Sequence, residues 1–341
     1  MRDWLEGHGV KEFAMQIFLA GATGAIGKRL LPMLVAAGHE VTGTTQHPDK
    51  MMAICSAGAT PLLMNALHEQ DVLAAVQKAQ PEVIIHQLTA IPPNLDLRHF
   101  DEGFELTNRL RTEGTDHLLA AARAVGARRF IAQSYSGWYA RTGSWIKTEA
   151  DPLISSGISD GQKTLDATIH LESAVLGERA METFVLRYGS FYGPGTSLAP
   201  GGWFLEGVRQ GHVPIVGRGT GHWSFIQIDD AAAATLAAVD APSPGVYNIT
   251  DNEPAAVSTW LPYLAEVLEA KAPRHAPKLL ARMAVGEYGV AVMTELRGAC
   301  NNKAKSLLGV RLRWPSWRIG FKYGLEDHIR QITDAVTPAI A

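Results

Sequence analysis

Three glycines at intervals of three residues, Gly21, Gly24 and Gly27, constrain this chain more than any other feature. The apolar run before them, residues 15–20, predicts a strand, and residues 28–37 have the apolar spacing of a helix. Strand, glycine turn and helix follow in the order of a dinucleotide-binding site. In such a turn the first glycine permits a tight bend. The second lets a pyrophosphate approach the backbone, and the third lets the helix pack closely on its strand.

The phosphates of a bound dinucleotide would lie at the N-terminus of this helix, where unpaired N–H groups and the positive end of the helix dipole meet. A second strand, residues 40–45, follows the helix. A turn without a ligand is the alternative, but this setting favours nucleotide binding. The turn residues predicted to contact the cofactor are Gly21, Thr23, Gly24, Ala25, Ile26 and Gly27.

Composition excludes several other classes of protein. Of the 341 residues, 46% are hydrophobic and 19% are charged, which is typical of a globular protein and not of a disordered one. The net charge of −3 gives no electrostatic basis for binding nucleic acid. Cys55 and Cys300 lie far apart, which favours the reducing cytoplasm over a disulfide framework or a zinc site. We expect no metal, because no His, Glu or Asp cluster has the spacing of a metal site. We expect no membrane partner, because no apolar run is long enough to span a bilayer.

Up to residue 192, predicted strands and helices alternate. The apolar runs predicted as strands are Gln16–Ala20, Val41–Thr45, Thr60–Met64, Val83–Leu88, Arg129–Ser134 and Thr183–Tyr188. Helical spacing occurs near residues 25–37, 48–57, 68–79, 103–125 and 161–179. This alternation predicts an α/β fold of Rossmann type with a doubly wound parallel sheet. We expect residues 15–192 to form this dinucleotide-binding domain, and residues 1–14, which lack an apolar signal core, to form an N-terminal extension.

From Gly193 onward, glycine- and proline-rich loops interrupt shorter elements. The predicted strands are Val213–Val216, Ser224–Ile228 and Val246–Ile249, and the predicted helices lie near residues 230–239, 258–270, 276–296 and 302–308. Residues 193–341 are therefore expected to form mainly a smaller α+β substrate-binding lobe, partly interwoven with the first domain.

The end of the second strand bears on the choice of cofactor. NAD-specific sites place a carboxylate there to bind the ribose hydroxyls. Here the strand ends in Thr45 and Gln46, followed by His47, and Lys50 and Arg29 are close in sequence. These side chains tolerate a 2′-phosphate, which favours NADP, although NAD remains the alternative.

Five further segments, taken in order, make the chain resemble the extended short-chain dehydrogenase/reductases, also called the NAD-dependent epimerase/dehydratase family. They are Gly114–Ala122, Arg129–Ser134, Leu186–Gly195, Phe225–Ala231 and Gly245–Ile249. The resemblance implies that Asn65 contacts the adenine and that Thr89 lies near the nicotinamide ribose. It also implies a homodimer formed through the helices near residues 103–125 and 161–179.

The chain departs from this family at its catalytic pair. The family has a tyrosine and a lysine four residues apart, with a glutamate four residues further on. Glu172 matches the glutamate, which puts Thr168 at the lysine position and Thr164 at the tyrosine position. A threonine hydroxyl titrates too high to replace the tyrosine as an acid, so these two catalytic candidates are expected only to form hydrogen bonds.

A second departure follows the fifth strand, where the family has a catalytic serine or threonine. Tyr135 falls at that position, with Ser134 and Ser136 on either side. Tyr135 is either a relocated proton donor or a packing residue, and a shift of one residue would restore a serine. Tyr139, Lys147 and Glu149, in the following loop, are weaker candidates for catalysis.

A third departure affects the substrate. Sugar-nucleotide members carry an arginine that clamps a diphosphate where this chain has Trp223. Aromatic side chains in neighbouring loops favour a flat or apolar small molecule. Arg218 and His222 keep a displaced phosphate contact open. The predicted substrate-binding residues are Trp138, Tyr139, Tyr192 and Trp223.

Three other polar residues have simpler interpretations. Asp230 precedes an alanine-rich helix and is expected to cap its N-terminus. His86 is expected to be a hydrogen-bonded core histidine. Arg187, at the end of the sixth strand, either pairs with a carboxylate or lines the site.

These observations predict an enzyme of the cytoplasm, an NADP-preferring oxidoreductase acting on a small, apolar or aromatic carbonyl-type substrate. A sugar-nucleotide epimerase or dehydratase is the first alternative. A non-catalytic NAD(P)-binding sensor protein is the second, because the catalytic pair is missing.

Overall fold

A computed structural model describes residues 14–156 and 159–326. Its centre is a seven-stranded parallel sheet in the order β12-β7-β5-β4-β1-β2-β3. The strands are β1 Gln16–Ala20, β2 Glu40–Thr45, β3 Thr60–Leu63, β4 Val83–His86, β5 Arg129–Tyr135, β7 Glu182–Tyr188 and β12 Gly245–Ile249. The predicted doubly wound α/β fold is therefore confirmed.

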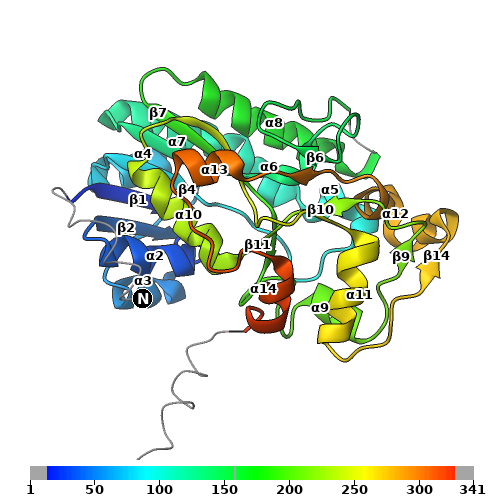
Figure 1. Cartoon of the computed structure of the whole chain (residues 1–341). Helices are drawn as coiled ribbons and strands as arrows, with labels where there is room; N and C mark the ends of the chain where they lie inside the picture. The colour runs from blue at the N-terminus through cyan, green and yellow to red at the C-terminus, as the bar shows by residue number, and fades with distance from the viewer. Residues whose placement is uncertain (1–13, 157–158, 327–341) are drawn as a thin grey trace, which may run out of the picture.

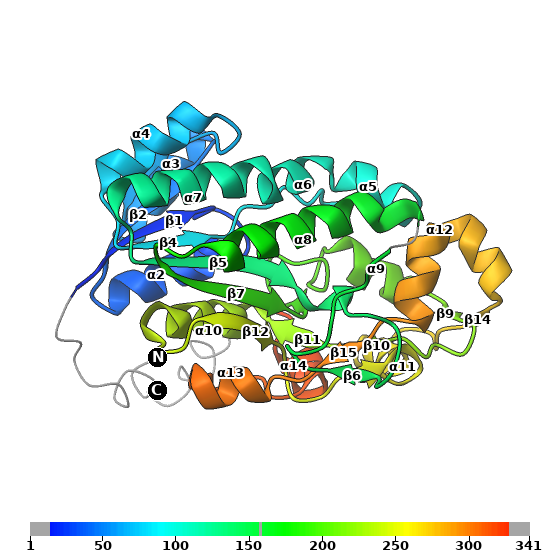
Figure 2. The same ribbon diagram turned by 90° about the horizontal axis from the view of Figure 1, so that it is seen from above.

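Helices cover both faces of the sheet (Figures 1 and 2). One face carries α2 (Gly27–Ala36) and α10 (Ile228–Asp240), which pack on each other. The opposite face carries α4 (Glu69–Ala79), α7 (Glu113–Val125) and α8 (Gln162–Gly177). Beside β3 lie η1 (Pro48–Lys50) and α3 (Met51–Ser56). Between β4 and α7 run η2 (Leu97–His99), α5 (Phe100–Gly103) and α6 (Glu105–Arg111).

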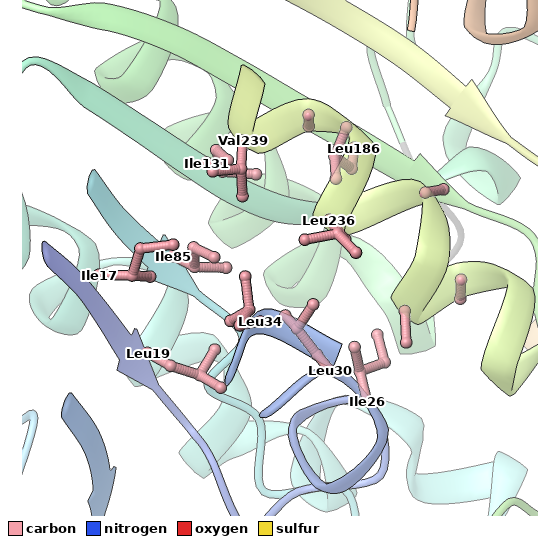
Figure 3. Close-up of a cluster of buried hydrophobic side chains, with 14 of the residues drawn as sticks. Ile17, Leu19, Ile26, Leu30, Leu34, Ile85, Ile131, Leu186, Leu236 and Val239 are labelled. Atoms are coloured by element: carbon pink, nitrogen blue, oxygen red, sulfur yellow. The ribbon is translucent and has the colours of Figure 1, made fainter. Parts of the chain in front are cut away.

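Alternation along β1 shows how the two faces are filled. Ile17 and Leu19 point into the core shared with α2 and α10, and Phe18 and Ala20 point into the core beneath α4 and α7. Figure 3 shows the first of these cores, in which Leu30 and other side chains of α2 meet side chains of β1, β4 and α10. Burial on both faces explains why the strands are continuous apolar runs.

After β3 the chain crosses to the other half of the sheet and enters β4, which pairs with β1. The strand order therefore reverses between the neighbouring strands β1 and β4. In open α/β sheets such a switch point leaves a crevice outside the carboxyl ends of the strands, and ligands bind there. The glycine turn leaves β1 at this end, so the topology and the motif indicate the same place.

The C-terminal part forms a lobe around a second, aromatic core that includes Trp260, Trp317 and Phe225. Its strands are β6 Ile146–Lys147, β8 Ser190–Tyr192, β9 Ile215–Val216, β10 His222–Trp223, β11 Phe225–Gln227, β13 Ala255–Ala256, β14 His275–Ala276 and β15 Gly298–Ala299. Its helices are α9 Trp203–Arg209, α11 Val257–Val267, α12 Lys278–Thr294, α13 Asn302–Leu307 and α14 Trp317–Tyr323. Two 3-10 turns, η3 (Ser136–Trp138) and η4 (Ser159–Gly161), lead into it.

Several expectations need correction. The strand expected in the lobe at residues 246–249 is instead the seventh strand of the central sheet, paired with β7. The helix expected over residues 103–125 is divided into α5, α6 and α7. The short helices α9 and α14 were not predicted, because each is only seven residues long and carries no clear periodic pattern. Of the predicted extension, residues 1–14, all but Ala14 lie outside the described residues.

The expected role of Asp230 as a helix cap is also wrong. Gln227 caps α10 by accepting a hydrogen bond from the Asp229 N–H. Asp230 lies inside α10, and its carboxylate accepts hydrogen bonds from the backbone N–H groups of Arg313 and Trp314, at 3.0 and 2.9 Å. Asp230 therefore holds a distant C-terminal segment against the first domain. Burial raises its pKa to about 6.

We predict that Asp230→Ala lowers the free energy of unfolding by about 1–3 kcal/mol, because two buried N–H groups lose their acceptor. The loss should be larger at pH 4.5 than at pH 7.5. The folded state holds the proton more tightly than the unfolded state, so this stabilising contribution disappears as pH rises through about 6. Urea denaturation at both pH values measures this, with Asp229→Ala, the half-buried neighbour that pairs with Arg29, as the control. An equal loss for the two variants would contradict the assigned role.

Candidate functional site

The glycine turn is closely packed at two of its three glycines. Gly21 has a φ of 92°, and a Cβ there would lie 2.8 Å from the carbonyl oxygen of Gln87. A Cβ on Gly27 would lie 2.2 Å from the carbonyl oxygen of Gly21. Backbone packing therefore requires both residues to be glycine. Gly27 allows α2 to begin directly against β1.

Gly24 has a different environment. It is exposed, and the nearest atom to a Cβ there is the Gly21 carbonyl oxygen at 3.4 Å, an ordinary contact. The protein itself tolerates a side chain at this position. A glycine here is explained by a ligand that approaches the backbone from outside, as the pyrophosphate of a dinucleotide does.

Donors for such a ligand are present at the same turn. The helical ladder begins with the bond from the Lys28 N–H to the Gly24 carbonyl, at 3.0 Å. The N–H groups of Ala25, Ile26 and Gly27 precede it, and no backbone carbonyl of the described residues accepts from them. Gly24 and Ala25 are exposed, whereas Ile26 is buried and anchors the turn. The residues thus fit a nicotinamide dinucleotide, with its pyrophosphate on this turn.

The other predicted cofactor residues lie at the tips of neighbouring strands. The Thr45 hydroxyl is 3.3 Å from that of Thr23 and accepts a hydrogen bond from the His47 N–H, so it joins the turn to the end of β2. Gln46 and Thr89 are exposed. Asn65 uses its side-chain oxygen to accept a hydrogen bond from the Leu67 N–H. These positions surround the carboxyl edge of the sheet, and their contacts with a cofactor stay predictions.

His86 is the hydrogen-bonded core histidine that was expected. Its Nε2 lies 3.1 Å from the Thr115 hydroxyl, and its Nδ1 accepts a hydrogen bond from the Leu88 N–H. Burial lowers its pKa to about 4, so the ring is neutral at physiological pH. Beside it, the side-chain oxygen of Gln87 is buried without a hydrogen-bond partner among the described residues.

Ser134 belongs to a buried ionic network. Its hydroxyl donates a 2.6 Å hydrogen bond to Oε1 of Glu172, and Arg187 binds both oxygens of that carboxylate, at 2.8 and 2.5 Å. Arg187 therefore pairs with a carboxylate, one of the two roles considered for it. The network joins α8 to β5 and β7. Ser134 is thereby placed to hold Glu172, and its hydroxyl proton is already engaged.

The two threonines predicted to stand at the family's catalytic positions are also engaged in structural hydrogen bonds. The Thr164 hydroxyl donates to Asp101 at 2.7 Å and accepts from the side-chain amide of Asn108 at 3.1 Å. The Thr168 hydroxyl donates to the Thr164 carbonyl within α8, at 2.8 Å. Both are buried, so neither hydroxyl faces an open site.

Tyr135 ends β5 and is only half buried. Its ring meets Trp138 edge to face at a centroid separation of 6.4 Å. Burial raises the pKa of the phenol above its ordinary value, which keeps it protonated at neutral pH. Ser136 is buried at the start of η3. Of the three candidates after β5, Tyr135 best retains the features of a proton donor.

The four predicted substrate residues lie in packed surroundings. Tyr139 is 1% exposed, and its hydroxyl donates to Asn248 at 2.7 Å. Trp138 and Tyr192 are buried in the aromatic core of the lobe, and the half-buried Trp223 donates from Nε1 to the Val292 carbonyl at 2.8 Å. Trp138 lies next to Tyr135, whereas Trp223 packs 4.9 Å from Trp260 inside the lobe. Any contact of these residues with a substrate is still a prediction.

The weaker candidates serve the fold. The Lys147 ammonium donates to the Thr142 carbonyl and to Asp151, and Glu149 accepts a hydrogen bond from the Asn248 N–H. Arg218 is exposed, and His222 packs 4.9 Å from the ring of Trp145.

Two residues near Tyr135 were not selected from the sequence. Arg111, at the end of α6, is buried, and Tyr288, on α12, stacks on Phe100 at a centroid separation of 3.7 Å. Arg111 stands between charged neighbours on a helix, a pattern that predicts an exposed residue. Tyr288 is distant in sequence from the rest of the site, so no local signal connects it with Tyr135.

Among the described residues, no group of three or more His, Cys, Asp or Glu side chains is arranged to hold a metal ion. In the same part of the chain, no helix is both long and apolar enough to cross a membrane.

Fold and site together define a dinucleotide-binding enzyme, and the comparisons identify its family. Residues 17–250 match the model of the NAD dependent epimerase/dehydratase family, so the chain belongs to that family. This confirms the resemblance found in the sequence.

Among curated relatives, the chain is similar to a 3-diazoavenalumate denitrifying reductase from a Streptomyces species. The two are 39% identical over 313 residues, which cover 90% of this chain and 99% of the relative. The chain is also similar to the 2-alkyl-3-oxoalkanoate reductase of Stenotrophomonas maltophilia, with 25% identity over 70% of this chain and 72% of the relative.

Solved structures share the fold. The UDP-glucose 4-epimerase of Thermotoga maritima superposes with a TM-score of 0.73 at 20% identity, over 94% of this chain and 100% of the other. A human epimerase family protein with NADPH has a TM-score of 0.70 at 20% identity, over 91% and 99%. Together with the reductase relatives and the family, these findings make the protein an NAD(P)-dependent oxidoreductase.

We predict that Gly24→Ala weakens binding of NADPH and NADH at least about tenfold while the melting temperature changes little, because the added methyl group meets only the ligand. Fluorescence titration and thermal unfolding measure the two effects. Gly177→Ala is the matched control, because a Cβ at that position meets no atom within 4 Å. Unchanged cofactor affinity in Gly24→Ala would contradict the assignment of the turn.

We also predict that Glu172→Ala lowers the free energy of unfolding by about 3–5 kcal/mol, because it leaves the Arg187 cation buried and unpaired. Ser134→Ala should cost only about 1 kcal/mol, because one hydrogen bond is lost and the ion pair remains. Urea denaturation measures both. A Ser134→Ala variant that folds normally but transfers no hydride would show that Ser134 is catalytic and not structural.

Proposed function

We propose that this protein reduces a small aromatic electrophile with a hydride from NADPH, and that a diazo group is the first substrate class to test. The relative that matches 90% of this chain is named for the reduction and denitrification of a diazo compound. The observation that carries the proposal is the engagement of Thr164 and Thr168, at the family's acid and lysine positions, in structural hydrogen bonds.

The chemistry of a diazo group explains why that acid is dispensable. When bound, the nicotinamide supplies a hydride. Replacement of N2 on an aromatic diazonium carbon breaks the carbon–nitrogen bond, forms a carbon–hydrogen bond and releases N2. The positive charge of the diazonium is cancelled by the hydride, so no alkoxide forms and no proton is needed. The residues have only to bind and orient the substrate.

A carbonyl substrate is the second candidate, and the position of Tyr135 favours it. Reduction of a carbonyl leaves an alkoxide, which takes a proton from a general acid. Tyr135 is half buried at the carboxyl end of β5, its phenol is protonated at neutral pH, and it packs beside Trp138. In this reaction Tyr135 is the proton donor, and aromatic neighbours favour an apolar or aromatic substrate.

The finer features of the protein also belong to this proposal. NADP is preferred over NAD, because β2 ends without a carboxylate at its tip. The exposed Gln46 and His47 and the nearby Lys50 tolerate a 2′-phosphate instead. The groove between α6 and α8, lined in part by Arg109 and Asp166, supports a homodimer formed through these helices. The protein acts in the cytoplasm.

The test compares benzenediazonium with benzaldehyde, each with NADPH and with NADH. We expect purified protein to oxidise NADPH with benzenediazonium, releasing one molecule of N2 for each hydride and forming benzene. Protein-free mixtures and the Gly24→Ala variant are the controls. Oxidation of benzaldehyde alone would support the second candidate. No oxidation with either compound, by a protein that binds NADPH, would contradict both.

The variant Tyr135→Phe separates the two reactions. We predict that it slows reduction of benzaldehyde by about 10²–10⁴-fold and changes reduction of benzenediazonium by no more than about twofold, because only the first reaction needs an acid. Steady-state rates with both substrates measure this. Tyr139→Phe is the control, since it removes a hydroxyl that Asn248 already binds. Equal loss in both reactions would show that Tyr135 is a packing residue.

A further inference from the structure

We propose that Arg111 binds a carboxylate of the substrate, so that the protein selects aromatic carboxylates. This inference rests on the proposed function, because it concerns the same site. It is carried by a buried cation that has no hydrogen bond or ion pair among the described residues and lies beside aromatic rings near the carboxyl end of the sheet.

Arg111 is the last residue of α6 and is only 8% exposed. No hydrogen bond or ion pair engages its guanidinium within residues 14–156 and 159–326, and its Nη1 atom is fully buried without a partner. Arg187 and Arg129, which are buried on strands of the central sheet, each have an ion-pair partner: Arg187 pairs with Glu172, although its Nη1 atom is unbonded, and Arg129 pairs with Glu182. Arg111 has no such partner among the described residues.

An unpaired buried guanidinium is costly. Transferring a charge away from water costs several kcal/mol unless an opposite charge compensates for it. Burial lowers the pKa of Arg111 to about 10, and the group is still a cation at neutral pH. A protein retains such a cation more readily where an anion arrives to pair with it. The planar guanidinium matches a carboxylate, which it can bind through two parallel hydrogen bonds.

No neighbouring side chain serves as that anion. Glu172 is close enough for its charge to act on Arg111, but both of its oxygens are bound by Arg187 and one also accepts from Ser134. The ionisable partners that act on Arg111 are Tyr288 and Glu172, and burial keeps the Tyr288 phenol neutral at physiological pH. The position for a counter-ion therefore remains open to a ligand.

The surroundings of Arg111 describe the rest of that ligand. Its guanidinium carbon lies 5.8 Å from the centre of the Phe104 ring, and Phe104 is 4.4 Å from Phe100. Phe100 stacks on Tyr288, whose ring is 5.8 Å from Trp138. Aromatic rings attract other aromatic rings in stacked and tilted arrangements, so this cluster favours binding of a flat aromatic molecule. A cation beside such rings selects one that carries a negative charge.

Arg111 also lies at the reacting end of the enzyme. Its charge acts on His86, the last residue of β4, and Tyr288 interacts with Tyr135 at the end of β5. β4 and β5 are paired neighbours, and β4 borders the crevice that begins at the glycine turn. A carboxylate held by Arg111 would orient the ring of the substrate at this edge of the sheet.

The experiment measures binding of benzoate and trans-cinnamate, each beside its uncharged amide, to the protein saturated with NADP⁺. The variants are Arg111→Met and Arg111→Lys, and Arg109→Met is the control on the exposed face of the same helix, where Arg109 pairs with Glu113. Isothermal titration calorimetry gives the affinities, and thermal unfolding reports on the fold.

We expect the wild-type protein to bind at least one carboxylate ten times or more tightly than its amide. Arg111→Met should abolish this preference, Arg111→Lys should keep part of it, and Arg109→Met should leave it unchanged. The melting temperature of Arg111→Met should be equal or higher, because an apolar side chain replaces an unpaired charge. Equal affinity for carboxylate and amide in the wild type would overturn the inference. So would loss of NADP⁺ binding in Arg111→Met.

Failure of the proposed function has a different outcome. A protein that shows the Arg111-dependent preference but reduces neither benzenediazonium and benzaldehyde nor their carboxylates, 4-carboxybenzenediazonium and 4-carboxybenzaldehyde, would keep the carboxylate site and contradict the proposed reactions. A protein that reduces any of these compounds without any preference for carboxylates would contradict only the role of Arg111.

Discussion

The structure depends first on the close contact between the two ends of the glycine turn. A Cβ on Gly27 would lie 2.2 Å from the carbonyl oxygen of Gly21, so α2 can begin against β1 only without a side chain. The same turn lies against the backbone of Gln87, which follows β4. One backbone contact thus joins the two halves of the sheet at the switch point. The N–H groups of Ala25, Ile26 and Gly27, which no backbone carbonyl of the described residues binds, belong to the same turn, and a pyrophosphate could accept from such groups.

Away from this turn, the site differs from what the motif alone would suggest. Glu172, Ser134 and Arg187 form a buried network in which Arg187 binds both carboxylate oxygens of Glu172 and Ser134 donates to one of them. Thr164 and Thr168 contribute hydrogen bonds to the packing of α8. The proposed hydride transfer therefore asks the enzyme for position and charge, and Tyr135 is the proton donor we propose for a carbonyl substrate.

The sequence predicts the fold well where the signal is local. The glycine spacing and the apolar runs place six of the seven strands of the central sheet, because buried parallel strands are continuous apolar segments. The strand at residues 245–249 was assigned to the lobe, since its pairing with β7 is made across many residues of intervening chain.

The site is harder to predict. Arg111 stands among Arg109 and Glu113, a pattern of exposed charges, and only the packing of α6 reveals that it is buried. Its aromatic neighbours come from α5, η3 and α12. These elements are far apart in the sequence, so no periodic pattern indicates that they lie together.

A crystal structure of the protein grown with NADPH tests the central claim most directly. The account predicts that the pyrophosphate lies against the backbone N–H groups of residues 21–27 and that the nicotinamide lies at the carboxyl ends of β4 and β5, beside Tyr135. A pyrophosphate bound elsewhere, or a nicotinamide directed away from Tyr135, would contradict it.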